Sequence, residues 1–363
     1  MPEGQKGVAP VFPLLGDRPP AGAQGEDRSG RFNHLERNGV SKETDQARGQ
    51  PTSGKRPTPT MTARNPRHSF SLPLAAGAAA FGGANAAVKE PKNARTLIVP
   101  VPYDATTTYL SGTRQGPSAI LRASQQLELF DEETGREMQE LGIATLDEVE
   151  VDAGGPMAMV ARVRALGEQA LAAGLFPLML GGEHLLSLGM IQAVAGEVER
   201  LSILHLDAHG DLRESYQGTP YSNACVMRLA SDYGSLVSVG IRALSVEEHR
   251  WLRERDLPVF YAGDIRRRPN WQAEVLAHLG PEVYVTTDLD VFDPAEMPAV
   301  GTPEPGGLHW YEILDLIRLV GQRRRLVGAD VMELCPQPGN PAPDFLAAKL
   351  VFKILAYRSA ARI

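Results

Sequence analysis

Short apolar runs alternate along the chain with longer stretches in which apolar residues recur at helical spacing. Uninterrupted apolar runs of this length predict strands buried on both faces, and they cover residues 96–101, 175–180, 201–206, 235–241, 259–261, 283–287 and 326–332. Helices are predicted between them, at 157–173, from about 184 to 195, and at 246–255, 271–279, 311–322 and 344–357. This alternation indicates an α/β fold with a mostly parallel sheet and helices on both of its faces.

One further helix is predicted to begin at Pro117, because the missing N–H of proline suits the first helical turn. Ile120, Ala123, Leu127 and Phe130 follow at the spacing of one helix face. We therefore expect a helix that carries all four of these side chains on its apolar side.

The N-terminal part of the chain differs from the rest in composition. Residues 1–68 are about one-quarter Gly and Pro and show little apolar periodicity, so we predict a disordered extension. Residues 69–91 are interpreted as a flexible arm, and 92–363 as one folded domain. Met61 is an alternative start. The stretch from there to Ala86 weakly resembles an export signal, but it is mostly Ala and Gly and is interrupted by Pro73.

Composition narrows the class of protein. Apolar residues make up 43% and charged residues 22% of the 363 positions, as in soluble globular proteins, and we expect a cytoplasmic location. The net charge of -7 argues against electrostatic binding of nucleic acid. No apolar run reaches the roughly 18 residues of a membrane span. Cys225 and Cys335 are expected to be reduced and buried.

The first candidate chemistry closes the strand predicted at 201–206. Asp207 and His209 follow it, and residues two apart in an extended backbone point to the same side. Asp211 joins them if the backbone stays extended past Gly210. Three ligand-type side chains aimed at one point suit a cation better than a core.

Two other strand ends carry the same kind of residue. Asp288 and Asp290 repeat the spacing of two at the end of 283–287, and His184 follows the strand at 175–180. In open parallel sheets, ligands bind where the strands end. The predicted metal ligands are therefore His184, Asp207, His209, Asp211, Asp288 and Asp290.

Charge balance suggests how many ions these residues hold. Four carboxylates grouped without a partner would raise one another's pKa, whereas two divalent cations would neutralise about four negative charges. Carboxylates with imidazoles suit Mn²⁺ best, with Fe²⁺, Co²⁺, Ni²⁺ and Zn²⁺ as alternatives. A thiolate zinc site is not expected, because Cys225 is the one cysteine near these motifs.

These strand ends belong to longer motifs, at Gly112–Ile120, Gly181–His184, Leu206–Asp211, Thr287–Pro294, Val300–Gly307 and Gly328–Glu333. In this combination, from about Lys92 to the C-terminus, the chain resembles the ureohydrolases, the family of the arginases and agmatinases. The resemblance implies a three-layer αβα fold and a binuclear manganese site that hydrolyses a guanidino group to an amine and urea. It also implies a homo-oligomer, a trimer or a hexamer.

The resemblance assigns roles residue by residue. Asp207 and Asp288 would bridge the two metals, His184 and Asp211 would complete one ion, and His209 and Asp290 the other. Water activated between the metals would be the nucleophile. Glu333 matches the acid that pairs with the guanidinium, which a carboxylate can accept bidentately.

One position departs from the family pattern. Asn223 stands where the family carries a histidine assigned to proton transfer, and an amide does not titrate. Three interpretations stay open: the enzyme is slow, another group such as Asp211 or His205 carries the proton, or Asn223 binds an altered substrate. We otherwise interpret His205 as a buried support of the site and Asp293 as a turn residue.

The loop Arg213–Ser222 bears on the substrate. It lacks the Ser- and Asn-rich pattern by which arginases hold an α-carboxylate, so agmatine, cleaved to putrescine and urea, is the leading substrate in a route of polyamine biosynthesis. Glu214 could bind its ammonium, whereas Arg213 would suit a guanidino acid such as guanidinobutyrate. The remaining alternative is a catalytically weak metal-binding homologue. The loop 301–307 is expected to form a wall of the site, and His249, His278 and His309 receive no role.

Overall fold

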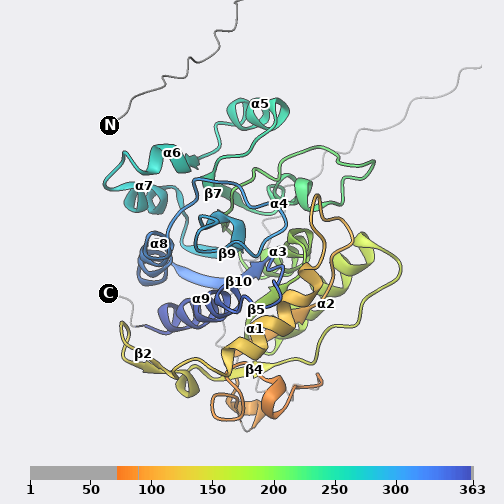
Figure 1. Ribbon diagram of the computed structural model, residues 1–363, viewed down its shortest axis with the longest axis vertical. Coiled ribbons are helices and arrows are strands. Elements are labelled where there is room, and N and C mark those ends of the chain that lie inside the picture. The colour runs from red at the N-terminus through yellow and green to blue at the C-terminus, as the bar shows by residue number, and fades with distance from the viewer. Residues whose placement is uncertain (1–71, 89, 361–363) are drawn as a thin grey trace, which may run out of the picture. The chain divides into compact units, whose positions relative to one another are not determined.

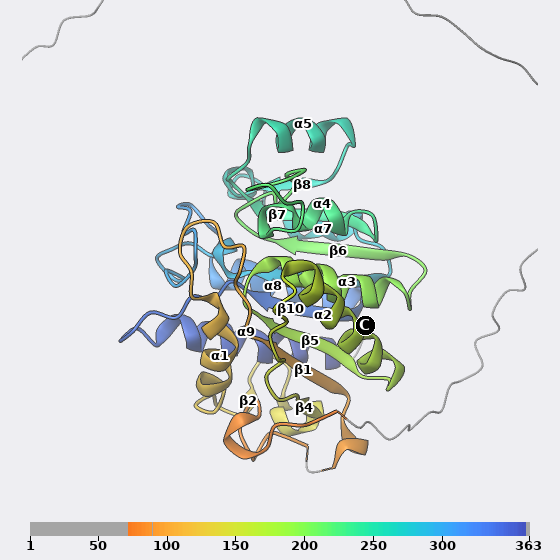
Figure 2. The same ribbon diagram turned by 90° about the vertical axis from the view of Figure 1, so that its right-hand side faces the viewer.

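The computed structural model describes residues 72–88 and 90–360 (Figure 1). Within them, an eight-stranded sheet has every neighbouring pair parallel, as predicted. Figure 2 shows the strands stacked from β8 at the top to β4 at the bottom. In spatial order they are β4 (Ile143–Thr145), β1 (Thr96–Val101), β5 (Phe176–Gly181), β10 (Arg325–Met332), β9 (Glu282–Asp288), β6 (Leu201–Leu206), β7 (Ser235–Ile241) and β8 (Val259–Tyr261).

Helices cover both faces of this sheet and make three layers (Figures 1 and 2). Alternate strand residues, such as Leu97 and Ile98, enter opposite cores, which is why the strands read as continuous apolar runs. One core includes α1 (Gly116–Ser124), α6 (Ala262–Ile265), α7 (Trp271–His278), α8 (Trp310–Arg323) and α9 (Ala342–Ser359). The other includes α2 (Pro156–Ala172), α3 (Ser187–Ala195), α4 (Val226–Ala230) and α5 (Val246–Glu254).

The predicted helix from Pro117 to Phe130 is wrong in its second half. Helix α1 ends at Ser124, whose hydroxyl donates to the carbonyl of Leu121 at 2.7 Å and accepts from the N–H of Gly82 at 2.9 Å. Leu127 is buried in the loop that follows. Phe130 is exposed and begins the antiparallel hairpin of β2 (Phe130–Asp131) and β3 (Arg136–Glu137). The helical spacing of Leu127 and Phe130 from the residues of α1 therefore does not reflect a helix.

Residues 72–88, part of the stretch predicted as a flexible arm, pack along the β4 edge of the sheet. Phe81 is fully buried, and its N–H donates to Thr145 Oγ1 at 3.1 Å. The N–H of Val88 donates to the carbonyl of Ile143 at 2.9 Å. These contacts cover an edge strand that the sequence analysis did not predict. The predicted extension over residues 1–68, and Met61 within it, lie outside the described residues.

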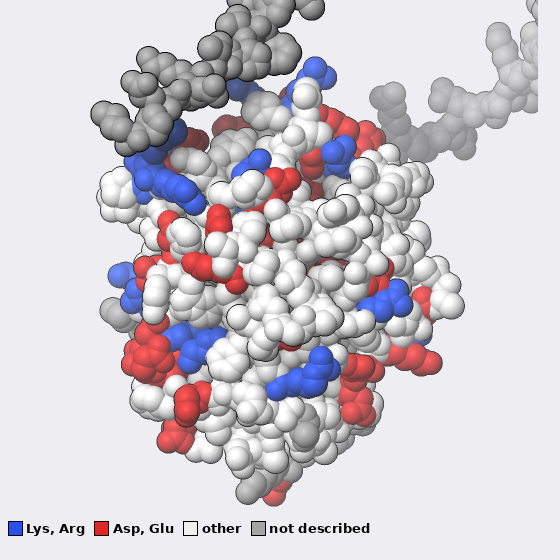
Figure 3. All heavy atoms as spheres, viewed as in Figure 1, with Lys and Arg blue, Asp and Glu red and all other residues white. Residues whose placement is uncertain are grey.

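The described helices and surface bear on three further expectations. None of these helices is long and apolar enough to cross a bilayer. On the face shown in Figure 3, acidic and basic side chains are interspersed. Both cysteines are free, but only Cys225 is buried; Cys335 is half-buried, so the expectation of two buried thiols is wrong there.

Candidate metal centre

Four neighbouring strands at the middle of the sheet, β5, β10, β9 and β6, build the site at their carboxyl ends. His184 follows β5, Asp207 follows β6, Asp288 ends β9 and Glu333 follows β10. Because parallel strands end at one edge of a sheet, residues as far apart as His184 and Glu333, 149 positions, come into hydrogen-bond contact.

The first group of ligand atoms surrounds one nitrogen of His184. Its Nδ1 lies 3.0 Å from Asp207 Oδ2, 3.1 Å from Asp211 Oδ2 and 3.4 Å from Asp288 Oδ2. This nitrogen is buried and makes no hydrogen bond of good geometry, while Nε2 is held by Thr286 Oγ1 at 2.9 Å. An imidazole oriented through one nitrogen, with the other facing carboxylate oxygens, is the arrangement expected around a cation.

The second group shares Asp207 with the first. His209 Nδ1 lies 2.9 Å from Asp290 Oδ2 and 3.6 Å from Asp207 Oδ1. Asp207 therefore turns one oxygen toward each group, and these side chains are close enough to hold metal ions. The residues present fit a pair of divalent cations, which the two groups would hold.

Asp211 and Asp290 reach the site by a route that the sequence analysis did not foresee. We expected Asp211 to join the group only if the backbone stayed extended past Gly210. The backbone at Asp211 is instead left-handed, with φ of 54°, and its side chain joins the group nevertheless. Asp290 lies in the 3₁₀ turn Leu289–Val291, and its N–H donates to Asp288 Oδ1 at 2.9 Å. Turns, rather than alternation along a strand, aim both carboxylates.

The pKa values of these groups show the electrostatic conflict of unneutralised carboxylates. Burial, together with the charges of Asp290 and Asp207, raises the pKa of Asp288 well above its usual range. Burial and Asp207 raise the pKa of Asp211 to about 6. Burial lowers the pKa of His184, but the surrounding aspartates outweigh this and hold it well above its usual value. Cations among these oxygens would relieve the conflict.

Glu333 lies beside the first group, where the resemblance implied the guanidinium-binding acid. It is buried, has a left-handed backbone with φ of 65°, and accepts the N–H of His184 at Oε1. Burial, reinforced by the charge of Glu183, raises its pKa to about 8. A non-glycine residue held at positive φ within a site is typical of functional positions.

Asn223 also lines the cavity, with a defined orientation. Its Oδ1 accepts the backbone N–H of Ala224 and the hydroxyl of Ser222, each at 3.1 Å. Because the backbone N–H of Ala224 can only donate, the side-chain atom of Asn223 that faces it must be the amide oxygen and not the NH₂ group. Because Oδ1 is engaged and Asn223 lines the cavity, its NH₂ group remains available as a hydrogen-bond donor.

Glu183 and Thr106 are site residues that sequence reasoning missed. Thr106 Oγ1 donates to Glu183 Oε1 at 2.9 Å and accepts the N–H of Asn223 at 3.3 Å. Burial raises the pKa of Glu183 to about 7. These bonds join the loop after β1 and the loop that carries Asn223 to the metal centre. Glu183 could have been found from the sequence, because it lies in the Gly181–His184 motif, where the sequence analysis gave a role to the histidine alone.

A cavity of about 280 Å³ opens over the metal groups. Its lining residues are His209, Asp211, Asp288, Asp290, Glu333, Asn223, Thr107, Thr108, Leu110, Arg213, Tyr216, Ala224, Ala243, Leu244, Ser245, Glu248, Gly301 and Thr302. Glu214, predicted as a partner for the substrate tail, is not among its lining residues. Its side chain is 77% exposed and lies 3.7 Å from Arg228, so that expectation is wrong.

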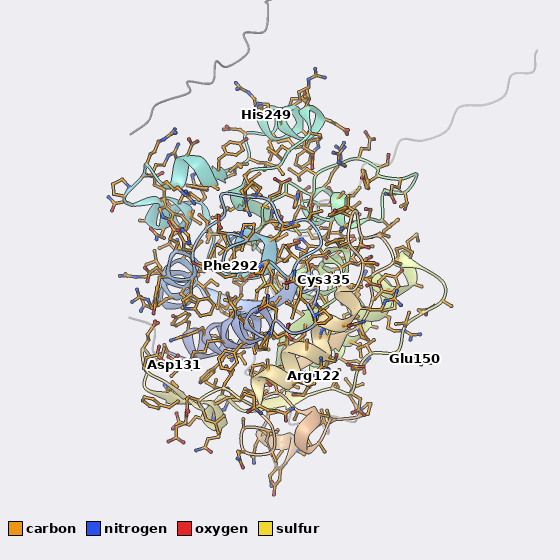
Figure 4. The ribbon with its side chains drawn as sticks, in the orientation of Figure 1. Arg122, Asp131, Glu150, His249, Phe292 and Cys335 are labelled. Atoms are coloured by element: carbon orange, nitrogen blue, oxygen red, sulfur yellow. The ribbon has the colours of Figure 1, made fainter. Side chains whose placement is uncertain are left out.

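The other singled-out residues lie largely as interpreted. Both ring nitrogens of His205 are engaged, Nε2 with Asp207 Oδ2 at 2.9 Å and Nδ1 with Ser238 Oγ at 3.1 Å, as suits a support. Asp293 accepts three backbone N–H groups of its turn and of the loop 301–307. His249 lies on α5 at the periphery, away from the strand ends near Phe292 and Cys335 (Figure 4).

Comparisons with known proteins cover the same part of the chain. The arginase family model matches residues 94–356. The N(1)-aminopropylagmatine ureohydrolase of Synechocystis sp. is 40% identical over 273 residues, which span 73% of this chain and 89% of that protein. The agmatinase of Bacillus anthracis is 36% identical over 250 residues, 68% of this chain and 85% of that protein.

A solved structure agrees with these sequence matches. The agmatine ureohydrolase of Thermoplasma volcanium superposes with a TM-score of 0.69 at 32% identity, and the match covers 76% of this chain and 93% of that one. The motifs, the assembled carboxylates and these relatives agree, and the chain belongs to the arginase family, the ureohydrolases.

Proposed function

We propose that this protein hydrolyses the guanidino group of a linear amine to urea and the free amine, with two Mn²⁺ ions held by the two ligand groups. The observation that carries the proposal is Asp207, whose two oxygens face His184 and His209 respectively. Divalent cations held by these groups would lower the pKa of bound water and so supply a nucleophile near neutral pH. Family membership supports the same reaction class.

The protein's own residues bind and orient the substrate. We assign the guanidinium to Glu333, whose Oε1 already accepts the N–H of His184 and whose other lone pairs face the cavity. Asn223 donates through its NH₂ group but cannot supply a proton. We assign proton transfer to the carboxylate of Asp211, which lines the cavity, because both nitrogens of His205 are engaged elsewhere.

For the substrate tail we favour an amine over an acid. Glu248 lines the cavity, is buried, and accepts only backbone N–H groups, from Leu212 at 3.0 Å and Ser245 at 2.7 Å, so its negative charge faces no cation in the described structure. Arg213 also lines the cavity, but its guanidinium lies 5.3 Å over the ring of Tyr216. A fixed buried carboxylate suits an ammonium-bearing tail.

Between two such amines, we place N(1)-aminopropylagmatine ahead of agmatine, the leading substrate of the sequence analysis. The support is the 40% identity to a relative named for that substrate, against 36% for an agmatinase. The further rivals are guanidinobutyrate, and a weak metal-binding homologue, which Asn223 favours. We also retain the homo-oligomer as part of the proposal.

One assay separates these candidates. Purified protein loaded with Mn²⁺ is given N(1)-aminopropylagmatine, agmatine, arginine and guanidinobutyrate in parallel, and urea is measured. We expect the highest kcat/KM for N(1)-aminopropylagmatine. A preference for agmatine would reverse our order of substrates, urea from guanidinobutyrate alone would overturn the amine tail, and bound metal without urea would support the weak homologue.

A further inference from the structure

Arg242, the residue after β7, inserts its guanidinium among backbone carbonyls at the side of the metal centre. Nη2 donates to the carbonyls of Asp290 at 2.6 Å, Glu304 at 2.8 Å and Phe292 at 3.2 Å. Weaker bonds reach Glu304 from Nε and reach Gly240 and Val291 from Nη1, at 3.3–3.4 Å. Within the described residues no carboxylate forms an ion pair with it, so its directional bonds go to the main chain.

Apart from the carbonyl of Gly240 in β7, these carbonyls come from two segments that shape the second ligand group. One is the turn after β9, which carries Asp290; the other is the loop 301–307, whose Thr302 lines the cavity. Asp290 is thus held at both ends. Arg242 binds its carbonyl, while its carboxylate accepts the N–H of Ala208 at 2.9 Å and faces Thr302 Oγ1 at 3.5 Å.

The first ligand group makes no bond with Arg242 itself, and it meets the turn that Arg242 holds at Asp288 Oδ1, which accepts the N–H of Asp290. His184 is oriented by Thr286 and Glu333, and none of its three carboxylate neighbours donates or accepts a bond with Arg242. A planar fork with five N–H donors can satisfy carbonyls on several sides at once, which the three donors of a lysine on a flexible stem cannot do in the same geometry.

We propose that Arg242 is a positioning residue that sets the affinity of the second metal subsite, at His209 and Asp290, independently of the first. The inference rests on the proposed binuclear function. Groups that orient metal ligands typically change metal affinity 10- to 100-fold when altered. The second ion should therefore bind about 10- to 100-fold more weakly in Arg242→Lys, and the first ion as in the wild type.

Arg324 provides a matched control. Its guanidinium also donates to backbone carbonyls, those of Leu276 at 2.9 Å, Leu279 at 3.0 Å and Arg323 at 3.2 Å, but these close the end of α7 and lie outside the metal groups and their cavity. We expect both Arg324→Lys and Arg242→Lys to lower thermal stability. Arg324→Lys, however, should not change the binding of either ion.

The experiment is a calorimetric titration of the metal-free full chain with Mn²⁺, with metal content measured after dialysis. We expect two ions in the wild type and in Arg324→Lys, and one retained ion in Arg242→Lys. Arg242→Gln is measured in the same way in case the lysine variant does not fold.

The inference would be overturned if a folded Arg242 variant bound both ions with wild-type affinity, or if the affinity for both ions fell equally. It would also be overturned if Arg242→Lys and Arg242→Gln both misfolded while Arg324→Lys folded, because Arg242 would then serve the whole fold. A wild-type chain that binds no Mn²⁺ would instead refute the proposed function itself.

Discussion

The backbone N–H of His184 donates a 2.7 Å hydrogen bond to Oε1 of Glu333, across two adjacent strands. A proposed metal ligand and the proposed guanidinium-binding acid are thereby held at a set separation. Under the proposed function this bond would fix the Glu333 carboxylate, and so the substrate carbon, relative to the ions, which is how a rigid site lowers the entropic cost of reaction.

Replacing Glu333 with Gln should leave the metal content at two ions and lower kcat/KM on the order of 10²-fold. The amide keeps the shape and the bond to His184 but removes the charge that pairs with the guanidinium, and hydrogen bonds to charged groups contribute about 1.5–3 kcal/mol. Urea release and metal analysis measure the two effects. Glu312→Gln, in the capping box of α8, is the control and should behave as wild type. Equal losses in both variants would contradict the assigned role.

Asn223→His tests whether the enzyme is slow because it lacks a titratable group in this loop. If so, urea release should rise, because a positioned acid or base typically contributes 10²- to 10⁴-fold. The gain would be reduced by the loss of the Oδ1 bonds that now hold Ser222 and Ala224. Steady-state kinetics on the preferred substrate decides, and unchanged or lower turnover would reject this interpretation.

Thr106→Val should raise KM and leave metal content unchanged, because it cuts the link between Glu183 and the loop of Asn223. Leaving a buried Glu183 oxygen unsatisfied should also cost about 1–3 kcal/mol of unfolding free energy. Thr134→Val, which removes a 2.7 Å bond to Asp131 far from the cavity, should lower stability without changing KM. If both variants raised KM alike, the link would have no specific role.

Lys353→Met should destabilise the fold by about 3 kcal/mol at pH 7, because it leaves the buried carboxylate of Asp131 without its partner at 2.6 Å. Lys349→Met removes a 3.8 Å pair with the exposed Glu132 and a cation–π contact 5.1 Å from the ring centre of Phe352, and should cost only about 1 kcal/mol. Chemical denaturation compares the two variants with the wild type.

The same pair predicts a pH dependence. In the wild type burial raises the pKa of Asp131, but Lys353 and Thr134 outweigh this and hold it below 3.8, so its stabilising contribution is present above that pH and is lost as pH falls through the lowered pKa. Without Lys353, burial raises the pKa of Asp131, and protonation removes the penalty as pH falls. The stability difference between the two proteins should therefore narrow from pH 7 toward pH 4. A constant difference would show that Asp131 is not the affected group.

Local patterns predicted the elements where burial itself is periodic. The strand at 201–206 was read correctly because an uninterrupted apolar run fits a strand buried on both faces, and the helix near 157–173 because its apolar residues recur at helical spacing. The same reasoning failed at Leu127 and Phe130, because nothing local signals that Ser124 bonds to Gly82 and ends the helix. It also missed the short edge strand β4, whose partner residues are distant in sequence.

By itself, the sequence determined the order of the longer strands and helices and placed the six candidate ligands after three of those strands, since alternation and motif spacing are properties of neighbouring residues. Only the tertiary structure decided that β5, β10, β9 and β6 are adjacent, that left-handed backbone aims Asp211, that Glu183 bonds to Thr106, and that Arg242 bonds to the carbonyl of Asp290. Strand adjacency and carbonyl contacts join residues far apart in the chain, and their free energy depends on packing that no local pattern records.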